Sequence, residues 1–278
     1  MKTIILPDEL KLDSLQSVQV FDYRSSQEAS KQQITLNQNA FSFLTEGTKE
    51  VVFSSCSLLI DNSQFLIMKF GNCLMTERLS AIGNYRSVLL FFNSDILLQF
   101  VRKIEMNDFG QAACNPVHNF VYDGFIRRFV NSLVDISELS KDLQNKLLEV
   151  KFEEIMIYLT ARYGNEFLYS LTAKSDTHTQ KFKQIIEGNQ LNKLTLKELA
   201  FLCNMSISSF KREFEKHYTE PPIKWFLNKR LEHAHYLLNY KKKSSSEIYF
   251  ELGFESLSSF IQAYKAHYRT TPKQHHKI

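Results

Sequence analysis

The chain has 278 residues, 44% of them hydrophobic, which is enough for two domains that each bury a core. This length and hydrophobic content exclude collagen-like, disordered and disulfide-scaffold chains, and none of the eight glycines are spaced for a GxGxxG or Walker loop. The four cysteines, Cys56, Cys73, Cys114 and Cys203, form no CxxC pair and indicate free thiols. The first residues lack a signal-peptide pattern, and the longest apolar stretch is too short to span a membrane. We therefore expect a cytoplasmic protein without a membrane segment.

Charge divides the chain into two parts of opposite sign. Residues 1–180 carry 17 Lys and Arg against 21 Asp and Glu, whereas residues 181–278 carry 17 against 9. Clustered basic residues bind polyanions because they release counterions from phosphates. The basic part is consistent with a nucleic-acid partner, although a solvated basic surface has the same composition.

Residues 17–92 favour short β-strands separated by turn residues. The predicted strands are 17–23, 33–37, 40–47, 49–55, 57–61, 64–70, 73–79 and 86–92. Many short, evenly spaced strands are typical of an antiparallel barrel or sandwich.

Helical periodicity begins at about residue 94. The spacing of apolar residues predicts helices over 94–104, with Ser94 or Asp95 as the cap, and over 123–134. A third predicted helix, 141–162, is followed by Gly164 as a C-cap. Residues 172–180 are small and polar and are the best linker candidate.

The apolar stripe of the third helix has two interpretations. It packs against the strands, or it forms the seam of a homodimer, and different parts of the helix can do each. The candidate dimerisation residues are Leu147, Leu148, Phe152, Ile155 and Leu159.

The basic part contains an internal repeat. Phe210, Phe214, His217, Tyr218 and Pro222 recur fifty residues later as Phe260, Tyr264, His267, Tyr268 and Pro272. Upstream, Leu199, Cys203 and Met205 match Ile248, Leu252 and Phe254 at an offset of 49. Two related helical units therefore lie in tandem, over about 195–218 and 244–268.

Each copy has the signals of a helix-turn-helix. Thr195 with Glu198, and Ser244 with Glu247, predict capping boxes at the first helix. Ser206 and Ser256 are placed to cap the second helix, and Gly253 can take a positive φ in the turn. The pattern predicts two recognition helices, each with a buried aromatic pair and an outward polar face.

The segment between the copies reads as one long helix that starts near Pro222. A rigid connection fixes the spacing of the two recognition helices. Major-groove segments on one face of B-DNA lie about 34 Å apart, so a single chain can span two adjacent grooves.

These residues resemble the AraC/XylS family of bacterial transcription regulators. The resemblance covers about residues 185–275. It rests on Leu199-Ala200, Met205-Ser206, Phe210-Lys211-Arg212, Phe214, Pro222, Arg230 to Ala234, Leu237-Leu238, Gly253-Phe254, Phe260 and Thr271-Pro272. Four positions depart from the family pattern: Tyr249 stands where Ala is usual, Thr219 and Arg269 where Gly is common, and Ser259 where an aromatic is usual.

The expected fold class is α+β. A cupin-like antiparallel β-barrel with trailing helices from about residue 94 occupies residues 1–171, followed by the linker and an all-α DNA-binding domain at 181–278. The resemblance implies that the barrel binds a small-molecule or protein effector, or dimerises. It also implies double-stranded DNA as the partner and, for an activator, which is the commoner mode, RNA polymerase.

Recognition is expected at the outward positions of the two helices. The candidate base-reading residues are Ser208, Lys211, Arg212, Leu257, Ser258, Ser259 and Gln262. Lys211 or Arg212 can donate to guanine, Leu257 can meet a thymine methyl, and Gln262 an adenine edge. The candidate phosphate contacts are Ser206, Ser256, Lys241, Lys242 and Lys265. The alternative is an interaction module whose second unit reads DNA weakly.

No catalytic constellation is present. The first 180 residues hold only His118 and His178, outside the strand region, so we expect no metal, no cofactor and no enzymatic activity.

Overall fold

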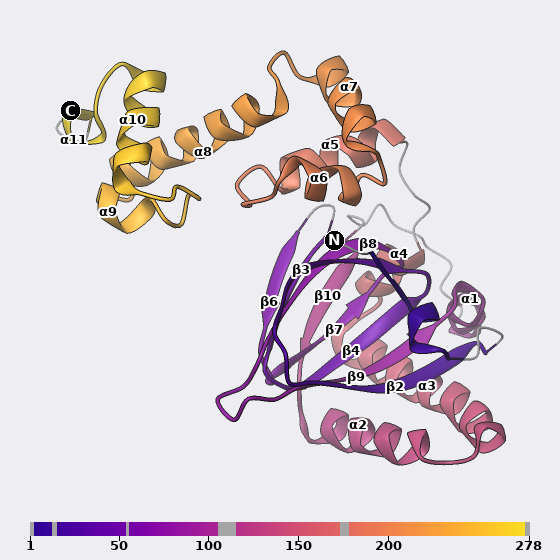
Figure 1. The fold of residues 1–278 in the computed structure, drawn as a ribbon. Helices are drawn as coiled ribbons and strands as arrows, with labels where there is room; N and C mark the ends of the chain where they lie inside the picture. Colours follow the sequence, from indigo (N-terminus) through magenta and orange to yellow (C-terminus); the bar gives the residue numbers. More distant parts are fainter. Residues whose placement is uncertain (1–2, 13–15, 54–55, 105–114, 173–177, 276–278) are drawn as a thin grey trace. The chain divides into compact units, whose positions relative to one another are not determined.

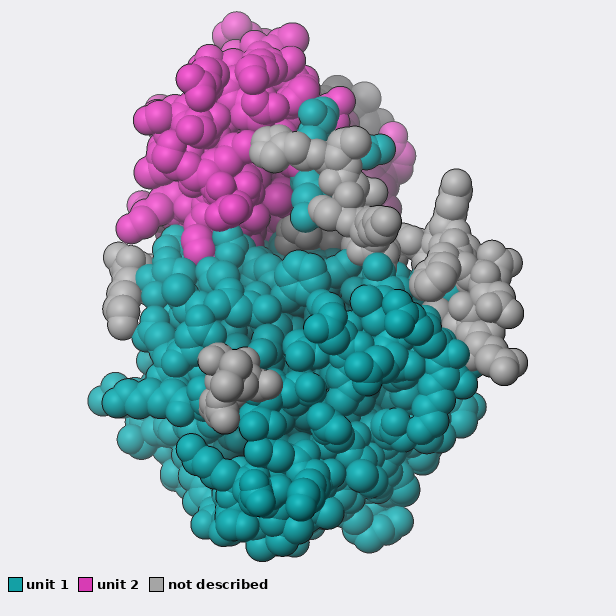
Figure 2. Space-filling view, turned by 90° about the vertical axis from the view of Figure 1, so that its right-hand side faces the viewer, with its two compact units in different colours: residues 1–181 teal, residues 182–278 magenta. Residues whose placement is uncertain are grey.

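The computed structural model describes residues 3–12, 16–53, 56–104, 115–172 and 178–275. The chain forms two compact units, residues 1–181 and 182–278, which Figure 2 colours separately. Residues 173–177 of the expected linker and Cys114 lie outside the described residues. Thr172 ends one helix and His178 begins the next, so residues at both ends of the expected linker are helical.

Unit 1 contains two five-stranded sheets with helices packed on one of them (Figure 1). The first sheet has the order β1-β3-β8-β5-β6 and the second β10-β7-β4-β9-β2. The strands are β1 (Ile4–Leu6), β2 (Val18–Ser25), β3 (Ala29–Leu36), β4 (Asn39–Glu46), β5 (Thr48–Val52), β6 (Ser57–Ile60), β7 (Gln64–Met68), β8 (Gly71–Arg78), β9 (Tyr85–Phe92) and β10 (Val117–Val121).

All eight predicted strands are present, as β2 to β9, and the predicted α+β class is confirmed. Two strands were not predicted: β1, which pairs in parallel with β3, and β10, which pairs with β7. The strands do not close into one barrel but lie in two separate sheets, both largely antiparallel.

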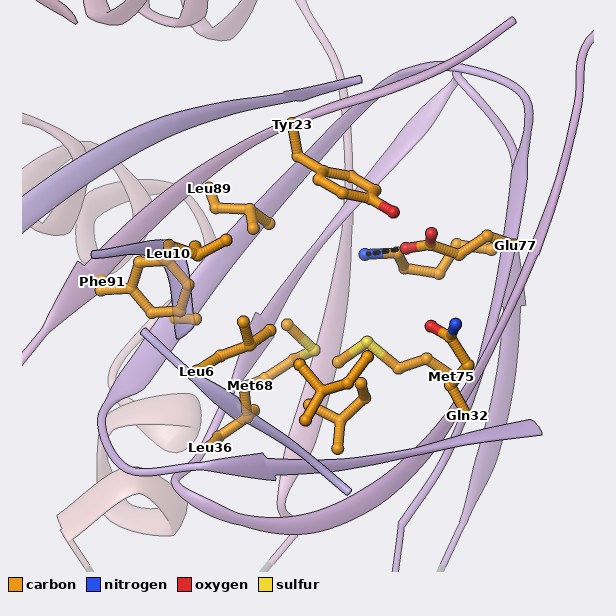
Figure 3. Close-up of a pocket in the computed structure, with 14 residues that line it drawn as sticks. Leu6, Leu10, Tyr23, Gln32, Leu36, Met68, Met75, Glu77, Leu89 and Phe91 are labelled. Carbon is orange, nitrogen blue, oxygen red and sulfur yellow. Dashed lines mark ion pairs between the residues drawn. The ribbon is translucent and has the colours of Figure 1, made fainter. Parts of the chain in front are cut away.

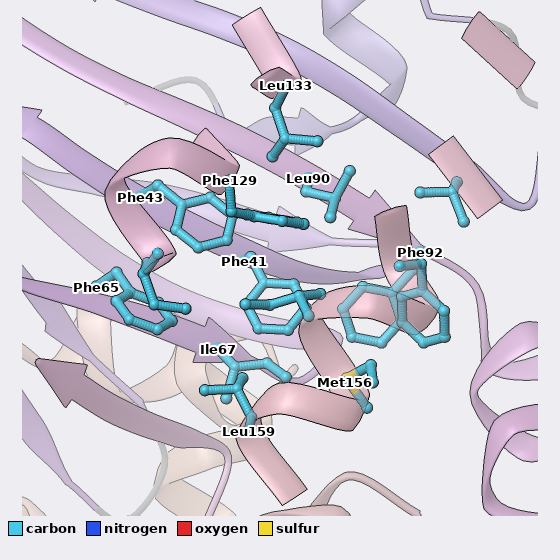
Figure 4. Close-up of a cluster of buried hydrophobic side chains, with 14 of the residues drawn as sticks. Phe41, Phe43, Phe65, Ile67, Leu90, Phe92, Phe129, Leu133, Met156 and Leu159 are labelled. Carbon is cyan, nitrogen blue, oxygen red and sulfur yellow. The ribbon is translucent and has the colours of Figure 1, made fainter. Parts of the chain in front are cut away.

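Strand alternation sends the side chains of the second sheet into two cores. Phe41 and Phe43 of β4 face the helices, while Ala40 and Leu44 of the same strand face the first sheet. Burial on both faces explains why β7 and β9 are almost continuously apolar. Figure 4 shows the helix-facing core, where Phe43 lies beside Phe129 and Phe65, with ring centroids 5.8 and 5.1 Å apart.

The helices of unit 1 are α1 (Ser94–Lys103), α2 (Gly124–Ser137), α3 (Lys141–Tyr163) and α4 (Glu166–Thr172), and the short 3-10 helix η1 (Asp8–Leu10) follows β1. The predicted cap of α1 was wrong by one residue: Asn93, not Ser94 or Asp95, accepts from the Ile96 amide at 3.0 Å. Asp123 caps α2 in the same way, and Gly164 ends α3 with a φ of 75°.

The residues proposed as a dimer seam on α3 lie inside unit 1. Leu148, Phe152, Ile155 and Leu159 are at most 2% exposed and belong to the core against the second sheet, and Leu147 packs beside them. For Leu148, Phe152, Ile155 and Leu159 the structure therefore shows the first interpretation, packing against the strands, which leaves these four side chains unavailable on the surface of unit 1. The face that remains exposed carries Leu143, Val150 and Ile157, one residue every seven.

The described part of unit 2 is helical, and its first helix begins a few residues before residue 182. Its helices are α5 (His178–Gly188), α6 (Leu196–Leu202), α7 (Ile207–His217), α8 (Pro222–Asn239), α9 (Ser245–Ile248), α10 (Leu257–Tyr268) and α11 (Pro272–His275). Figure 1 shows α7 and α10 beside opposite ends of α8. No helix in the described parts of the chain has the length and apolar character needed to cross a membrane.

Candidate DNA-binding surface

The first helix-turn-helix consists of α6 and α7. The Thr195 amide donates to Glu198 Oε2 at 2.6 Å, and the Glu198 amide donates to Thr195 Oγ1 at 3.2 Å. This is the predicted capping box, and it satisfies amides that the first turn of α6 leaves unpaired. Ser206 then caps α7 by accepting from the Ser209 amide at 3.1 Å.

The orientation of α7 is fixed by its aromatic residues. Phe210 and Phe214 are fully buried, and they pack with Phe182 of α5 and Phe226 of α8. Since the buried pair occupies one face, the opposite face is exposed to solvent. The three predicted base-reading residues of this helix, Ser208, Lys211 and Arg212, are exposed.

The second helix-turn-helix repeats this arrangement in α9 and α10. The Ser244 hydroxyl and the Ser244 amide each donate to Glu247 Oε2 at 2.6 Å, and these two hydrogen bonds, the hydroxyl's first, lower the pKa of the Glu247 carboxyl. Phe260 and Tyr264 are fully buried in a core with Leu231 and Leu238 of α8. The predicted capping box and the predicted buried pair are therefore both present.

The predicted base-reading residues of α10 differ in availability. Ser258 and Gln262 are exposed, whereas Leu257 is partly buried against the core of this unit. Ser259 is exposed, but its hydroxyl donates to the Ser256 carbonyl at 2.8 Å as part of the helix cap. Gln262 and Ser258 are the side chains of this helix that remain best placed to meet a ligand.

The turns of the two units use the same conformation at matching positions. Gly253 has a φ of 84°, as predicted, and Asn204, 49 residues earlier, has a φ of 55°. Glycine and asparagine are the residues that adopt left-handed backbone most readily. A Cβ at position 253 would lie 2.8 Å from Arg230 Nη1, so the second turn also requires a close approach.

Helix α8 holds the two helix-turn-helix units of unit 2 together. Phe226, near the start of α8, packs in the core of the first helix-turn-helix. Leu231 to Leu238 pack in the core of the second helix-turn-helix. Lys193, in the loop before α6, donates to the Phe250 carbonyl of the second unit and lies over the Phe250 ring at 4.2 Å. With a rise of about 1.5 Å per residue, α8 is a spacer of about 27 Å between its ends.

The basic residues of the predicted interface are unneutralised. Lys216, Lys224 and Lys229 pair with carboxylates of their own helix or its flank at 2.7–2.9 Å. By contrast, no ion pair with another described residue involves the following exposed side chains: Lys211, Arg212, Lys241, Lys242 and Lys265. Unpaired surface cations are available for phosphate or base contacts without first breaking a salt bridge.

The positions that depart from the family pattern end their helices in different ways. Arg269 caps α10 in a left-handed conformation with a φ of 62°, as the usual glycine would. Thr219 follows an extended Tyr218, and it is not among the positive-φ residues. Of these two helix ends, therefore, only that of the second helix-turn-helix has a residue with a side chain in the strained left-handed conformation that glycine would adopt freely.

Comparison with known proteins agrees with this geometry. A sequence profile of the ExsA N-terminal regulatory domain matches residues 39–171, and a helix-turn-helix domain profile matches residues 199–277. The thermoregulatory protein LcrF of Yersinia pestis is 29% identical over 160 residues, and the regulator ExsA of Pseudomonas aeruginosa is 29% identical over 126. The chain belongs to the AraC/XylS family.

The matched region covers 57% of this AraC-family chain and 59% of LcrF, and 45% of both chains for ExsA. The chain therefore matches about three fifths of the length of its first relatives. Among solved structures, ToxT of Vibrio cholerae is 13% identical over 94% of this chain and 98% of its own, with a TM-score of 0.40.

One candidate position of this AraC-family domain was not predicted. Ile207 is 42% exposed at the start of α7, at the position equivalent to Leu257 fifty residues later. The repeat offset could have identified it. Within the described residues no cluster of three potential metal ligands occurs. Burial raises the pKa of the Cys203 thiol, at the end of α6 in the first helix-turn-helix, to about 12, so it stays protonated.

Proposed function

We propose that this AraC-family protein is a sequence-specific DNA-binding regulator that activates transcription. The observation that carries the proposal is the pair of capped helices, α7 and α10, which bury an aromatic pair and expose polar faces. Connection through α8 lets one chain place the two helices in adjacent major-groove segments.

Lys211 and Arg212 are the proposed guanine readers, because both are exposed and unpaired on the outer face of α7. Gln262 is the proposed adenine reader of α10, with Ser258 and Ser259 beside it and Leu257 contributing its exposed part to a thymine methyl. Lys241, Lys242 and Lys265, with the caps Ser206 and Ser256, are the proposed phosphate contacts, which fix the register.

Activation is supported by the relatives. The VirF protein of Yersinia enterocolitica, 29% identical over 160 residues, is named a virulence regulon transcriptional activator. An activator of this kind would contact RNA polymerase while bound to its site in the bacterial cytoplasm. The chain has no enzymatic role in this proposal, in keeping with relatives that are transcription regulators.

Unit 1 would sense an effector and pair two copies of the chain. The exposed stripe Leu143, Val150 and Ile157 on α3 is evenly spaced and about half exposed. Because the stripe is symmetric about Val150, two copies can pair across a two-fold axis with Val150 at its centre. The proposed homodimer contact is thus on the face of α3 opposite the buried Leu148, Phe152, Ile155 and Leu159.

Selection of genomic fragments by the purified full-length protein at near-physiological salt tests the proposal. We expect the retained fragments to share a motif of two segments whose centres lie about one helical turn apart. Retention without any shared motif would mean that the basic surface binds DNA through charge alone, and would contradict sequence-specific regulation.

A further inference from the structure

A cavity of about 100 Å³ lies inside unit 1, between the two sheets. Its walls are mostly apolar and come from both sheets and from the segment of β1 and η1. Figure 3 shows Leu6, Leu10, Leu89 and Phe91 on one side of it, with the thioethers of Met68 and Met75 between the two sides.

The opposite side of the cavity is polar. Figure 3 shows the Tyr23 hydroxyl, the Glu77 carboxylate and the Gln32 amide gathered there, with a dashed line for the ion pair. Lys49 Nζ lies 3.6 Å from Glu77 Oε1 and donates to Ser42 Oγ at 2.9 Å. Lys49 is 2% exposed and Glu77 is 6% exposed.

A buried ion pair is an expensive way to fill a core, since apolar residues of similar volume usually serve as well or better. Its position at one end of an otherwise apolar cavity gives the space an amphipathic character. Ligand pockets share this design, in which a few polar groups orient a molecule held mainly by apolar walls.

The charges in the cavity balance. Lys49 is compensated by Glu77, and the nearby Cys73 thiol stays neutral because burial raises its pKa to about 12. A carboxylate ligand placed near Lys49 would meet Glu77 as well, and an ammonium near Glu77 would meet Lys49. Either ion would add an uncompensated charge to a buried site.

We infer that this cavity binds a compact, uncharged amphiphile, whose hydroxyl or carbonyl group meets Lys49 and Glu77 and whose apolar body packs on the leucines and methionines. The cavity, at about 100 Å³, is smaller than an engineered cavity of about 150 Å³ that binds benzene, but it is partly open to solvent, so the largest ligand that fits is one small ring with a short polar substituent. The inference rests on the proposed sensing role of unit 1 for the ligand's purpose, but the binding is measured without DNA.

The test compares isosteric probes on the full-length protein by calorimetry at neutral pH. Benzyl alcohol should bind at least about tenfold more tightly than benzoate or benzylamine, a difference of about 1.4 kcal/mol. Toluene should also bind more weakly than benzyl alcohol, because it leaves the polar groups of the cavity without a partner. Benzoate binding as tightly as benzyl alcohol, or no binding of benzyl alcohol, would overturn the inference.

Two variants locate the site. Ala40→Leu adds volume at the cavity wall, where Ala40 is 1% exposed, and should abolish benzyl alcohol binding. Glu77→Gln leaves Lys49 uncompensated and should reverse the order, so that benzoate binds more tightly than benzyl alcohol. The matched control is Glu50→Gln, a partly exposed carboxylate next to Lys49 on β5 that does not line the cavity.

Unchanged binding in Ala40→Leu, or an unchanged order of probes in folded Glu77→Gln, would overturn the inference. If Glu77→Gln does not fold, the loss of benzyl alcohol binding in Ala40→Leu and the order of probes in the wild-type protein still test the inference. The same protein is assayed for DNA retention. Absence of DNA binding together with intact benzyl alcohol binding contradicts the proposed function and leaves the inference standing. Intact DNA binding without benzyl alcohol binding overturns the inference and leaves the proposed function standing.

Discussion

Single residues of unit 2 differ in how freely they can meet DNA. Lys211 and Arg212 are exposed on α7 without a carboxylate partner among the described residues, while Lys216 on the same helix is held by Glu213 at 2.8 Å. The bond to Lys216 lowers the pKa of Glu213, which therefore stays ionised and keeps the lysine occupied. The readers and the structural cations of one helix can thus be separated by experiment.

Replacing both Lys211 and Arg212 by alanine should relax the sequence preference by about 1–3 kcal/mol per lost base contact. The midpoint of thermal unfolding should stay unchanged, because both side chains are exposed. Binding-site selection with each variant measures the preference. Lys216→Ala is the control and should keep it, and an intact preference in the double variant would remove Lys211 and Arg212 from base reading.

Arg269→Gly should raise the free energy of unfolding of unit 2 by about 1 kcal/mol, because Arg269 holds a φ of 62° that costs a side chain but not glycine. Thr219→Gly is the control at the equivalent helix end. Thr219 is not in the left-handed region, so glycine there should not stabilise the protein and should only loosen the chain. Denaturant unfolding of both variants measures the difference, and destabilisation by Arg269→Gly would refute the assignment.

Individual elements show where sequence patterns were sufficient. The eight central strands, the capping boxes and the repeat were predictable because their signals are local: alternation, cap residues and a fixed offset. β1 was not, since three residues that pair in parallel with β3 carry no local pattern. The burial of α3 was ambiguous because apolar residues occupy both of its faces, and periodicity does not say which face meets the sheet.

The turn between α9 and α10 depends on Gly253. Gly253→Ala should lower the free energy of unfolding by about 1–2 kcal/mol, since alanine adds a Cβ to a φ of 84° and contacts Arg230 Nη1. Gly83→Ala is the matched control, because Gly83 has a φ of 78° but no atom within 4 Å of the added Cβ. Chemical unfolding should show the larger loss at position 253, and equal losses would mean that the contact with Arg230 is unimportant.

The exposed stripe of α3 gives the proposed dimer a direct test. Val150→Glu should convert the dimer to a monomer, because the two new carboxylates would face each other across the two-fold axis, where their repulsion and desolvation disfavour association. Val150 is 63% exposed, so folding should be unaffected. Leu59→Glu, which changes a 70% exposed leucine on β6, is the control. A wild-type monomer, or a dimeric Val150→Glu protein in sedimentation equilibrium, would contradict the proposed contact.

The whole molecule combines a mildly acidic unit that contains a polar-ended cavity with a basic unit that presents two helices. The division of charge and the repeat were readable from sequence. The cavity was not, because strands rich in phenylalanine and leucine describe a filled core and a hollow one equally well. Likewise the partial burial of Leu257 depends on how α10 packs against α8, which spacing alone does not determine.

The central claim is that one chain reads two major-groove segments with α7 and α10 held at a fixed spacing by α8. It is tested most directly by inserting about five base pairs, half a helical turn, between the two segments of a selected site. We expect affinity to fall to the level of unrelated DNA at the same salt, while an insertion of the same size outside the site has no effect. Undiminished binding to the split site would show that the two helices do not act as one rigid reader.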